Sequence, residues 1–426
     1  MATHPKPPPD DRDRPRTLGG FPDPPGPELD HRAKHDLGPR MAPLSEVDIR
    51  TSIRPTVATV DLGAMARNVA RLRAIIGPGV KLWGVIKADA YGHGAVAVGR
   101  ALEPLCDGLA VSLVEEGLEL RAAGIRGPVI VLGAYFNRHQ RDVLDEGLTP
   151  VVYDPGDLDR FAAAAAERGR RLGVHLKVDT GMGRLGVATA QLPYLLDRLA
   201  VPGPLSLAGL CTHFASADLP DRAATDEALA RFQRCLDLAA ERGLRGLVNH
   251  AANTAAAVRF PDARLDAVRP GLALYGALPS LQVAAGLPGL EPALRLSTRI
   301  MSLHDVPVGG TVSYGGLWRA SRPSRVATLP IGYADGYPRH VRGASVLVRG
   351  RRTPIVGAVC MDMLMVDVTD VAGASQNDAV TLIGDDGVER ITIDDVASWA
   401  GTISYEILCG ISKRVPRVYN PAPQIP

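Results

Sequence analysis

Short hydrophobic runs alternate with amphipathic segments between about residue 56 and residue 290. Most of the amphipathic segments have helical periodicity, and 157–170 (DLDRFAAAAAERGR) places its acids first and its arginines last, as a helix dipole favours. Eight of the hydrophobic runs are rich in aliphatic and β-branched residues, which is typical of buried strands: 80–87, 108–112, 128–133, 149–153, 173–179, 205–213, 246–250 and 267–276. Regular alternation of strands and helices predicts a parallel sheet covered by helices.

Eight such units over roughly 200–240 residues fit a (β/α)8 TIM barrel. The alternative is an open doubly wound sheet, but no GxGxxG motif follows an early strand here. After about Pro292 the pattern changes to strands separated by turns, and helical periodicity returns only at 393–402. The fold class is therefore α/β, with a TIM barrel followed by a C-terminal mostly-β domain. The run at 56–62 (TVATVDL) lies outside the eight strands, and we expect it to pair with the β-rich domain.

Proline is concentrated near the N-terminus, where Met1–Leu44 contains 11 of the 35 prolines and a single aromatic residue. A segment of this composition buries too little apolar surface to offset the entropy lost on ordering. We therefore expect a disordered proline-rich leader at 1–50, a barrel at 51–290 and a β-rich domain at 291–426. Met41 is an alternative to Met1 as the translation start.

Composition and charge exclude several classes of protein. Lys+Arg is 48 and Asp+Glu is 46, so the net charge of +2 gives no support for a nucleic-acid or polybasic membrane surface. The N-terminal segment has no apolar run typical of a secretory signal, and no apolar run of about 18 residues occurs later. We therefore expect neither export nor a membrane span. Its five cysteines are odd in number and form no CxxC, which favours reduced thiols in the cytoplasm.

Active sites of TIM barrels form at the C-terminal ends of the strands. Polar residues gather at those ends in this sequence: Lys87, Lys177, Arg184, His213, Asn253, Thr254 and Arg269, the last just before Gly271. Lys87 emerges from an apolar strand, and desolvation favours the free amine, which can form a Schiff base or act as a base. The alternative is a lysine whose head group lies in solvent.

Three further patterns suggest chemistry, although each alone has a simpler explanation. Glycines at 181, 183 and 186 surround Arg184, whose guanidinium can hold a phenolate or carboxylate. Thr254 and Gly271 lie in the loops after strands seven and eight, which often bind phosphate in this barrel, or they serve only as turn and cap residues. Histidines 93, 213 and 250 lack HExxH or HxH spacing, so core or stacking roles suit them better than metal ligation.

Taken together, these residues lie in strings that resemble the alanine racemase family of pyridoxal-5′-phosphate enzymes. The strings occur in family order from about residue 55 to 420: VIKADAYGHG, HLKVDTGMGRLG, THFASAD, HAANTAA, VRPGLALYG, VSYG, IGYADGY, VCMD and ISYEILCGISKRVPR. The resemblance implies a barrel plus a β-domain, and interconversion of L- and D-alanine to supply D-alanine for peptidoglycan. It also implies a cytoplasmic homodimer whose two sites each contain residues from both subunits.

The resemblance assigns roles residue by residue. Lys87 would bind the cofactor covalently and act as one catalytic base. The phosphate would be held by Tyr91, Thr254, Gly271, Leu272 and Tyr405, with Asn253 beside them. Arg184 would contact the phenolic oxygen and the substrate carboxylate, and Lys177 matches a position that is often carbamylated and then orients this arginine. His213 would pack against the pyridine ring.

Arg269 would face the pyridine nitrogen, where its guanidinium cannot take up the proton that a carboxylate would hold there. Tyr314 would be the second base, on the opposite face of the substrate Cα. Tyr314 and Met361 would reach the site of the other subunit. Asp362, Tyr333 and Arg339 would support that site from the β-rich domain.

Two positions depart from the family pattern. The family more often has arginine where this chain has Ala358, and glutamine where it has Met363. Ala358 removes a charge from the family's substrate corridor, which leaves strictness for alanine open. The alternative is therefore a broad-specificity amino-acid racemase on the same scaffold, and rates with alanine, serine, lysine and arginine distinguish the two. An amino-acid decarboxylase is disfavoured by Arg269 and Tyr314, and a non-enzymatic cofactor-binding module by the second domain.

Overall fold

The structure, a computed structural model, describes residues 53–133, 135 and 139–421. The leader predicted at 1–50 lies outside these residues. Across the part that is described, no helix combines the length and the apolar character needed to cross a bilayer.

Eight parallel strands form a closed barrel, as the alternation of strands and helices predicts. They are β2 (Lys81–Val85), β3 (Gly108–Val111), β4 (Val129–Val131), β5 (Thr149–Val152), β6 (Leu172–Asp179), β8 (Leu205–Cys211), β9 (His250–Asn253) and β10 (Ala267–Arg269). The strands pair in the order β5-β4-β3-β2-β10-β9-β8-β6, and a further pairing between β5 and β6 closes the ring. The short strand β7 (Val187–Ala188) adds to β6.

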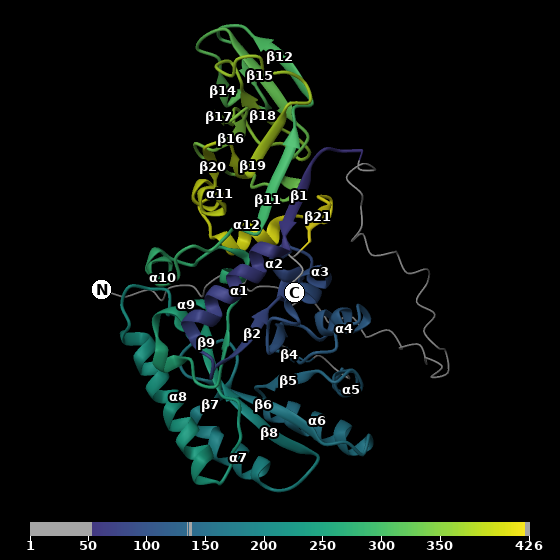
Figure 1. Cartoon of the computed structure of the whole chain (residues 1–426), viewed down its shortest axis with the longest axis vertical. Coiled ribbons are helices and arrows are strands. Elements are labelled where there is room, and N and C mark those ends of the chain that lie inside the picture. The colour runs from purple at the N-terminus through teal and green to yellow at the C-terminus, as the bar shows by residue number, and fades with distance from the viewer. Residues whose placement is uncertain (1–52, 134, 136–138, 422–426) are drawn as a thin grey trace, which may run out of the picture. The chain divides into compact units, whose positions relative to one another are not determined.

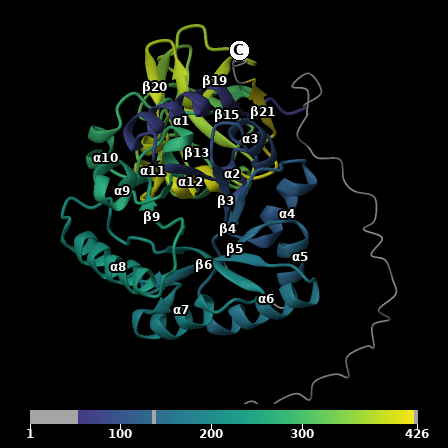
Figure 2. The ribbon, with the colours of Figure 1, turned by 60° about the horizontal axis from the view of Figure 1, so that its bottom comes forward.

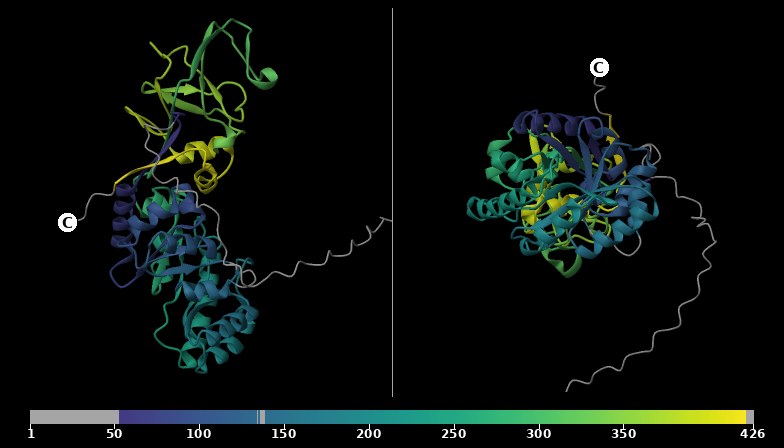
Figure 3. Two further views of the ribbon diagram at one scale, coloured as in Figure 1. Left: turned by 90° about the vertical axis from the view of Figure 1, so that its right-hand side faces the viewer. Right: turned by 90° about the horizontal axis from the view of Figure 1, so that it is seen from below.

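Helices cover the outside of the barrel, as Figure 2 and the right-hand view of Figure 3 show. Asp154 begins the alanine-rich helix by accepting hydrogen bonds from the amides of Gly156 and Asp157, with Pro155 in the first turn, as is common at helix N-termini. The covering helices are α1 (Leu62–Ile76), α3 (Ala95–Leu102), α4 (Val114–Ala122), α5 (Gln140–Asp145), α6 (Pro155–Glu167), α7 (Leu192–Ala200), α8 (Ala223–Glu241) and α9 (Thr254–Arg259).

The region predicted as the seventh strand differs from the sequence pattern. We expect a strand at 246–250, but β9 begins at His250 and ends at Asn253. The side chain of Asn249 accepts a hydrogen bond from the Leu210 amide at 3.0 Å, and this replaces a backbone ladder bond. Asn253 is the last residue of the strand and also caps α9, where its side chain accepts from the Ala256 amide.

The β-rich domain contains two main sheets. One includes β11 (Leu294–Arg299), β16 (Ser345–Val348), β17 (Arg351–Pro354), β19 (Ala379–Asp386) and β20 (Glu389–Ile391). The other contains β12 (Ser302–Val306), β15 (Ser324–Leu329) and β18 (Leu364–Asp367), and β13 (Thr311–Val312) forms a hairpin with β14 (Trp318–Arg319). Two helices follow, α11 (Ile393–Ala400) and α12 (Ser404–Gly410).

The expected pairing of 56–62 with the β-rich domain is confirmed. Strand β1 (Val57–Asp61) lies between β11, to which it is antiparallel, and β21 (Arg417–Asn420), to which it is parallel (Figure 1). The start and the end of the described chain therefore meet in one sheet. A single cluster of buried hydrophobic residues extends from the barrel into this domain.

Arg417 of β21 connects the end of α12 to the first loop of the barrel. Its guanidinium donates to the carbonyl of Gly92 at 3.0 Å and to the carbonyls of Ile411, Ser412 and Val415 at 2.6, 2.6 and 2.7 Å. Only a forked, donor-only group satisfies four carbonyls at once.

We predict that Arg417→Ala lowers the free energy of unfolding by on the order of 3 kcal/mol, because charged hydrogen bonds to four part-buried carbonyls are lost. Arg417→Lys should recover only a fraction of this, since an ammonium lacks the fork. Lys413→Ala, at a nearby exposed residue, is the control and should change stability little. Urea unfolding measures all three; equal stability of Arg417→Ala and the control would contradict the role given to Arg417.

Candidate active site

A cavity of about 580 Å³ opens at the C-terminal ends of the barrel strands. Its volume lies within the range of small-molecule and cofactor sites. The barrel residues predicted from strand ends and loops line it, as do Tyr91 and Leu272, which the family resemblance implies: Lys87, Tyr91, Lys177, Arg184, His213, Asn253, Thr254, Arg269, Gly271 and Leu272. Tyr405 of α12 lines it as well, so the β-rich domain contributes to the same cavity.

Lys87 begins α2 (Lys87–Gly92), a short turn with an unusual backbone. Residues 88–91 have φ between 51 and 53° and ψ between 41 and 53°, which is a left-handed helical conformation. None of these residues is glycine, and each costs about 1–2 kcal/mol in this region. Such strain is typical of functional sites, where the surrounding structure must hold it in place.

Glu116 of α4 holds the beginning of this turn. Its carboxylate accepts hydrogen bonds from the amide of Ala88 at 2.6 Å, from Ser112 at 2.7 Å and from Leu113 at 3.0 Å. Asp89 fixes the end of the turn, because its side chain accepts from the Ala95 amide at 2.6 Å. The strained turn is thus tied to the loops on both sides of it.

The environment of Lys87 favours its uncharged amine. Burial lowers the pKa of Lys87, and the neighbouring Arg184 lowers it further. A larger share of this lysine is then a free nucleophile at neutral pH than for a lysine in solvent. This agrees with the expectation from its position after an apolar strand.

A polar corner of the cavity is formed by α2, α12 and the loops after β9 and β10. Thr254 accepts a hydrogen bond from the Gly271 amide at 3.0 Å, which joins the two loops. A Cβ at Gly271 would lie only 2.4 Å from the Tyr91 hydroxyl, so any other side chain would displace the phenol. The rings of Tyr91 and Tyr405 lie 5.8 Å apart, and burial raises the pKa of Tyr405 to about 12.

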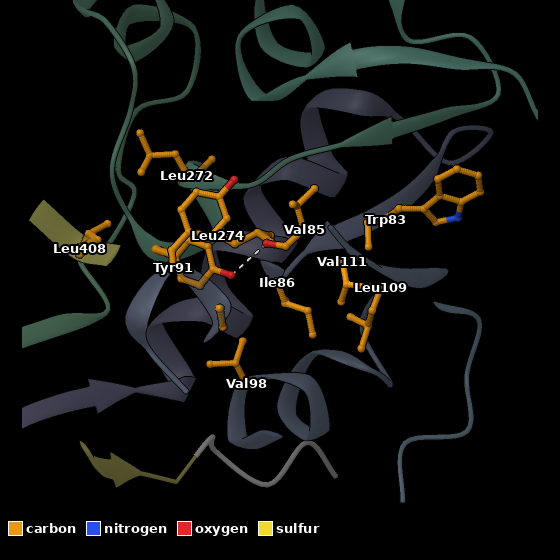
Figure 4. Packing of buried hydrophobic residues seen from close by; sticks show 14 of the residues in the cluster. Trp83, Val85, Ile86, Tyr91, Val98, Leu109, Val111, Leu272, Leu274 and Leu408 are labelled. Carbon is orange, nitrogen blue, oxygen red and sulfur yellow. Dashed lines mark hydrogen bonds between the residues drawn. The ribbon is translucent and has the colours of Figure 1, made fainter. Parts of the chain in front are cut away.

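The ring of Tyr91 is buried among hydrophobic side chains, and its hydroxyl lies at the polar corner of the cavity. Figure 4 shows the ring among Leu272, Leu274 and Leu408, and these residues belong to the main hydrophobic cluster. The ring centroid of Tyr275 lies 4.9 Å from that of Tyr91, and the Tyr275 hydroxyl donates to the carbonyl of Val85. The packing fixes the ring, so that the hydroxyl is presented to Gly271.

Arg269 is buried beneath the cavity. It contacts Nδ1 of His250 and donates to the carbonyls of Thr212 and Ala251 at 2.8 and 3.1 Å. His213 lies 3.4 Å from the same guanidinium, and burial together with Arg269 lowers the pKa of His213 well below its ordinary value. His213 is therefore a neutral ring at pH 7, suited to stacking rather than to holding charge.

Lys177 lies within β6 rather than at its end. It is buried, and this desolvation lowers its pKa, with Arg269 and Arg184 contributing in the same direction. Arg184 is exposed at the rim of the cavity. Four cations, Lys87, Lys177, Arg184 and Arg269, therefore line one cavity and favour an anionic ligand.

The residues predicted on the β-rich domain lie apart from this cavity, except Tyr405. Tyr314 is 75% exposed and Met361 53% exposed, and neither lines the cavity of its own chain. Tyr333 and Arg339 line a separate groove, and Asp362 forms an ion pair with Arg414 at 2.7 Å. The structure thus separates the predicted residues into a barrel group and a β-domain group.

Several residues of the site were not predicted from the sequence. Glu116, Ser112, Cys211 and Ile403 either line the cavity or hold its strained turn. Cys211 pairs in register with Lys177, so its place at the end of a predicted strand was an available signal. Nothing in the local sequence separates Glu116 from its neighbour Glu115.

The fold and site define a barrel enzyme whose polar corner and free amine suit a phosphorylated carbonyl cofactor. Two family models match the chain: "Alanine racemase, N-terminal domain" at residues 60–279 and "Alanine racemase, C-terminal domain" at 293–419. The alanine racemase of Sorangium cellulosum is 45% identical over 381 residues, which covers 86% of this chain and 100% of the relative. That of Halothermothrix orenii is 42% identical over 369 residues, covering 86% and 97%.

Solved structures agree with the sequence comparisons. The alanine racemase of Streptomyces lavendulae superimposes with a TM-score of 0.83 at 35% identity, covering 88% of this chain and 99% of the other. The biosynthetic alanine racemase of Pseudomonas aeruginosa has a TM-score of 0.79 at 38% identity, covering 86% and 100%. The chain belongs to the alanine racemase family. Its activity is the interconversion of L- and D-alanine, an isomerase reaction that supplies D-alanine for peptidoglycan.

We predict that Glu116→Ala lowers the free energy of unfolding by about 2 kcal/mol, because the amide of Ala88 in the strained turn and two amides of the loop before α4 lose a charged acceptor. Racemase activity should fall as well, since the turn carries Lys87. Glu115→Ala, at the exposed adjacent residue, is the matched control. Thermal unfolding and initial rates test this; a loss in Glu115→Ala as large as in Glu116→Ala would refute the assignment.

Proposed function

We propose that the chain binds pyridoxal 5′-phosphate in the cavity and racemises alanine with two bases, Lys87 and Tyr314 of the partner subunit. The observation that carries this proposal is a desolvated lysine in a cavity lined by three further cations and a polar corner. Five free thiols suit a reducing compartment, and we place the enzyme in the cytoplasm.

The residues present fit the cofactor at both of its ends. At one end, the hydroxyls of Tyr91, Tyr405 and Thr254 and the amide of Leu272 would offer donors to a phosphate. The Gly271 amide orients Thr254 by donating to its hydroxyl, and the missing Cβ of Gly271 leaves room for the Tyr91 hydroxyl. At the other end, Lys87 offers a free amine to the aldehyde. Asn253 adds an amide to the same wall.

When bound, the cofactor withdraws electron density from the substrate Cα and so acidifies its hydrogen. Lys87 then removes or returns the proton on one face of Cα, as its lowered pKa allows. Arg184 binds the substrate carboxylate through its forked donors at the rim of the cavity. The ring of His213, neutral at pH 7, would offer the cofactor an uncharged aromatic surface.

Arg269 controls the outcome of the reaction. Its guanidinium is held by Thr212, Ala251 and His250, and it faces the pyridine nitrogen in our proposal. Because a guanidinium offers only donors, it does not accept or share the proton that a carboxylate partner would stabilise there. With Arg269 at that position, the bound cofactor would be a weaker electron sink, which would favour return of the proton over side reactions.

Lys177 influences Arg184 through its charge. The lowered pKa of Lys177 favours its free amine, and a free amine is the form that takes up carbon dioxide as a carbamate. Such a carbamate would place an anion beside Arg184. That anion would offset the charge of the arginine and orient it.

Tyr314 serves the site of the other subunit. Racemisation needs proton removal on one face of Cα and delivery on the other, and a second base on the opposite face meets that need. The exposure of Tyr314, Met361 and the neighbouring Leu317 supports a surface that a second copy of the chain covers. Tyr333, Arg339 and Asp362 lie on the same domain and support that surface.

We predict that Lys87→Ala abolishes covalent attachment of the cofactor and lowers kcat by more than about 10²-fold. Lys81→Ala, at the exposed first residue of the preceding strand β2, is the control and should behave as the parent enzyme. The measurement is borohydride reduction of the holoenzyme, followed by mass spectrometry of its peptides. Label retained on any peptide of Lys87→Ala would show that another lysine carries the cofactor.

We predict that Tyr314→Phe slows exchange of the Cα hydrogen with solvent far more from one alanine enantiomer than from the other. The reason is that Lys87 still serves its own face, while the opposite face loses its base. Tyr194→Phe, an exposed tyrosine on α7, is the control. Deuterium incorporation followed by NMR from each enantiomer tests this, and an equal loss from both would argue against two bases.

A further inference from the structure

The residue before Tyr314 has a backbone conformation that is almost confined to glycine. Ser313 has φ 68° and ψ −177°, between the end of β13 and the turn that carries Tyr314. A serine in this region is strained, and such strain persists only where the surroundings determine the conformation. The two glycines that follow, Gly315 and Gly316, also have positive φ, but glycine adopts it without a Cβ penalty.

The side chain of Ser313 is tied to a neighbouring turn at residues 357–360. Its hydroxyl donates to the carbonyl of Ala358 at 2.8 Å and lies 3.4 Å from Sγ of Cys360. The two backbones approach so closely that a Cβ at Gly357 would lie 2.7 Å from the Ser313 Cβ and 2.7 Å from the Val312 carbonyl oxygen. Neither glycine nor alanine at position 313 could make the hydroxyl contacts.

The turn at 357–360 is itself held on its other side. The carbonyl of Cys360 accepts from the Tyr333 amide at 3.0 Å, and the carbonyl of Met361 accepts from the Ala334 amide at 3.0 Å. Val312 and Val356 are buried in one small hydrophobic cluster beneath the hairpin. Ser313 therefore connects the Tyr314 loop to a rigid support that also carries Met361 and Tyr333.

We propose that Ser313 is a positioning residue: its hydroxyl holds the strained backbone that directs Tyr314 out of the hairpin toward the partner's cavity. Tyr314 is 75% exposed in the single chain, so the backbone before it, rather than packing within its own subunit, sets its direction. This inference rests on the proposed function, in which Tyr314 is the second base. A displacement of about 1 Å at a reacting group is enough to cost up to about 10²-fold in rate.

The test compares Ser313→Ala with Ser313→Gly in the holoenzyme. Ser313→Ala loses the hydroxyl but keeps the Cβ that makes the conformation costly. Ser313→Gly also loses the hydroxyl, but glycine adopts this conformation without strain. Ser302→Ala, at an exposed serine of β12, is the matched control. Each variant is assayed for kcat, KM and hydrogen exchange from both alanine enantiomers, next to Tyr314→Phe.

We expect Ser313→Ala to lower kcat by about tenfold to a hundredfold, with KM changed by less than about twofold. Its exchange should be slowed from the same enantiomer that Tyr314→Phe affects. Ser313→Gly should lower kcat and the exchange rate clearly less than Ser313→Ala does, because a glycine backbone adopts the native turn without strain. Parent-like exchange and kcat in Ser313→Ala, or equal losses from both enantiomers in the alanine and glycine variants, would overturn the proposal.

A second readout does not depend on turnover. In chain labelled with 3-fluorotyrosine, the ¹⁹F resonance that disappears in Tyr314→Phe belongs to Tyr314. Ser313→Ala should broaden or split that resonance, and Ser302→Ala should leave it unchanged; an unaltered resonance in Ser313→Ala would overturn the positioning role. The resonance tests Ser313 alone, whereas the exchange ratio of Tyr314→Phe tests the two-base function alone, so the two failures are distinguishable.

Discussion

The left-handed turn at 88–91 is the constraint on which the site depends. Its left-handed backbone carries Lys87 and Tyr91, four residues apart, and both side chains line the cavity. The turn does not persist by local preference, since its residues are not glycine. Glu116 accepts from the amide of Ala88 at its start, Arg417 donates to the carbonyl of Gly92 just after it, and Asp89 within the turn accepts from the amide of Ala95.

The positive charge of the site is concentrated in the cavity. The chain as a whole has a net charge of only +2, yet four cations line one cavity. Burial lowers the pKa of Lys87 and of Lys177, so their mutual repulsion is relieved in part by loss of protons. In the proposed function, an anionic cofactor and a carboxylate substrate would provide the remaining compensation.

Much of the fold could be predicted from hydrophobic periodicity, because each strand of the barrel is a separate buried run. The pairing of β1 with the β-rich domain was also predictable, since 56–62 had no place among eight strands. The strand at 246–250 was predicted wrongly because a side chain, Asn249, takes the place of a ladder partner. Most cavity residues were predictable because strand ends converge in this fold.

What escaped prediction depends on contacts between distant segments. The alanines at 88 and 90 favour a right-handed helix, and contacts with the distant Glu116 and Arg417 help to hold the left-handed turn. The strain at Ser313 depends likewise on the turn at 357–360, 44 or more residues away. Local propensity contains no information about such partners.

The central claim is that each site takes Lys87 from one subunit and Tyr314 from the other. The most direct measurement mixes two inactive chains, Lys87→Ala and Tyr314→Phe, under conditions that exchange subunits, and assays alanine racemisation. A mixed dimer then has one site with both bases intact and one with neither, so the account predicts that activity returns on mixing. If both bases came from the same chain, every site in every dimer would lack one of them, and mixing would restore nothing.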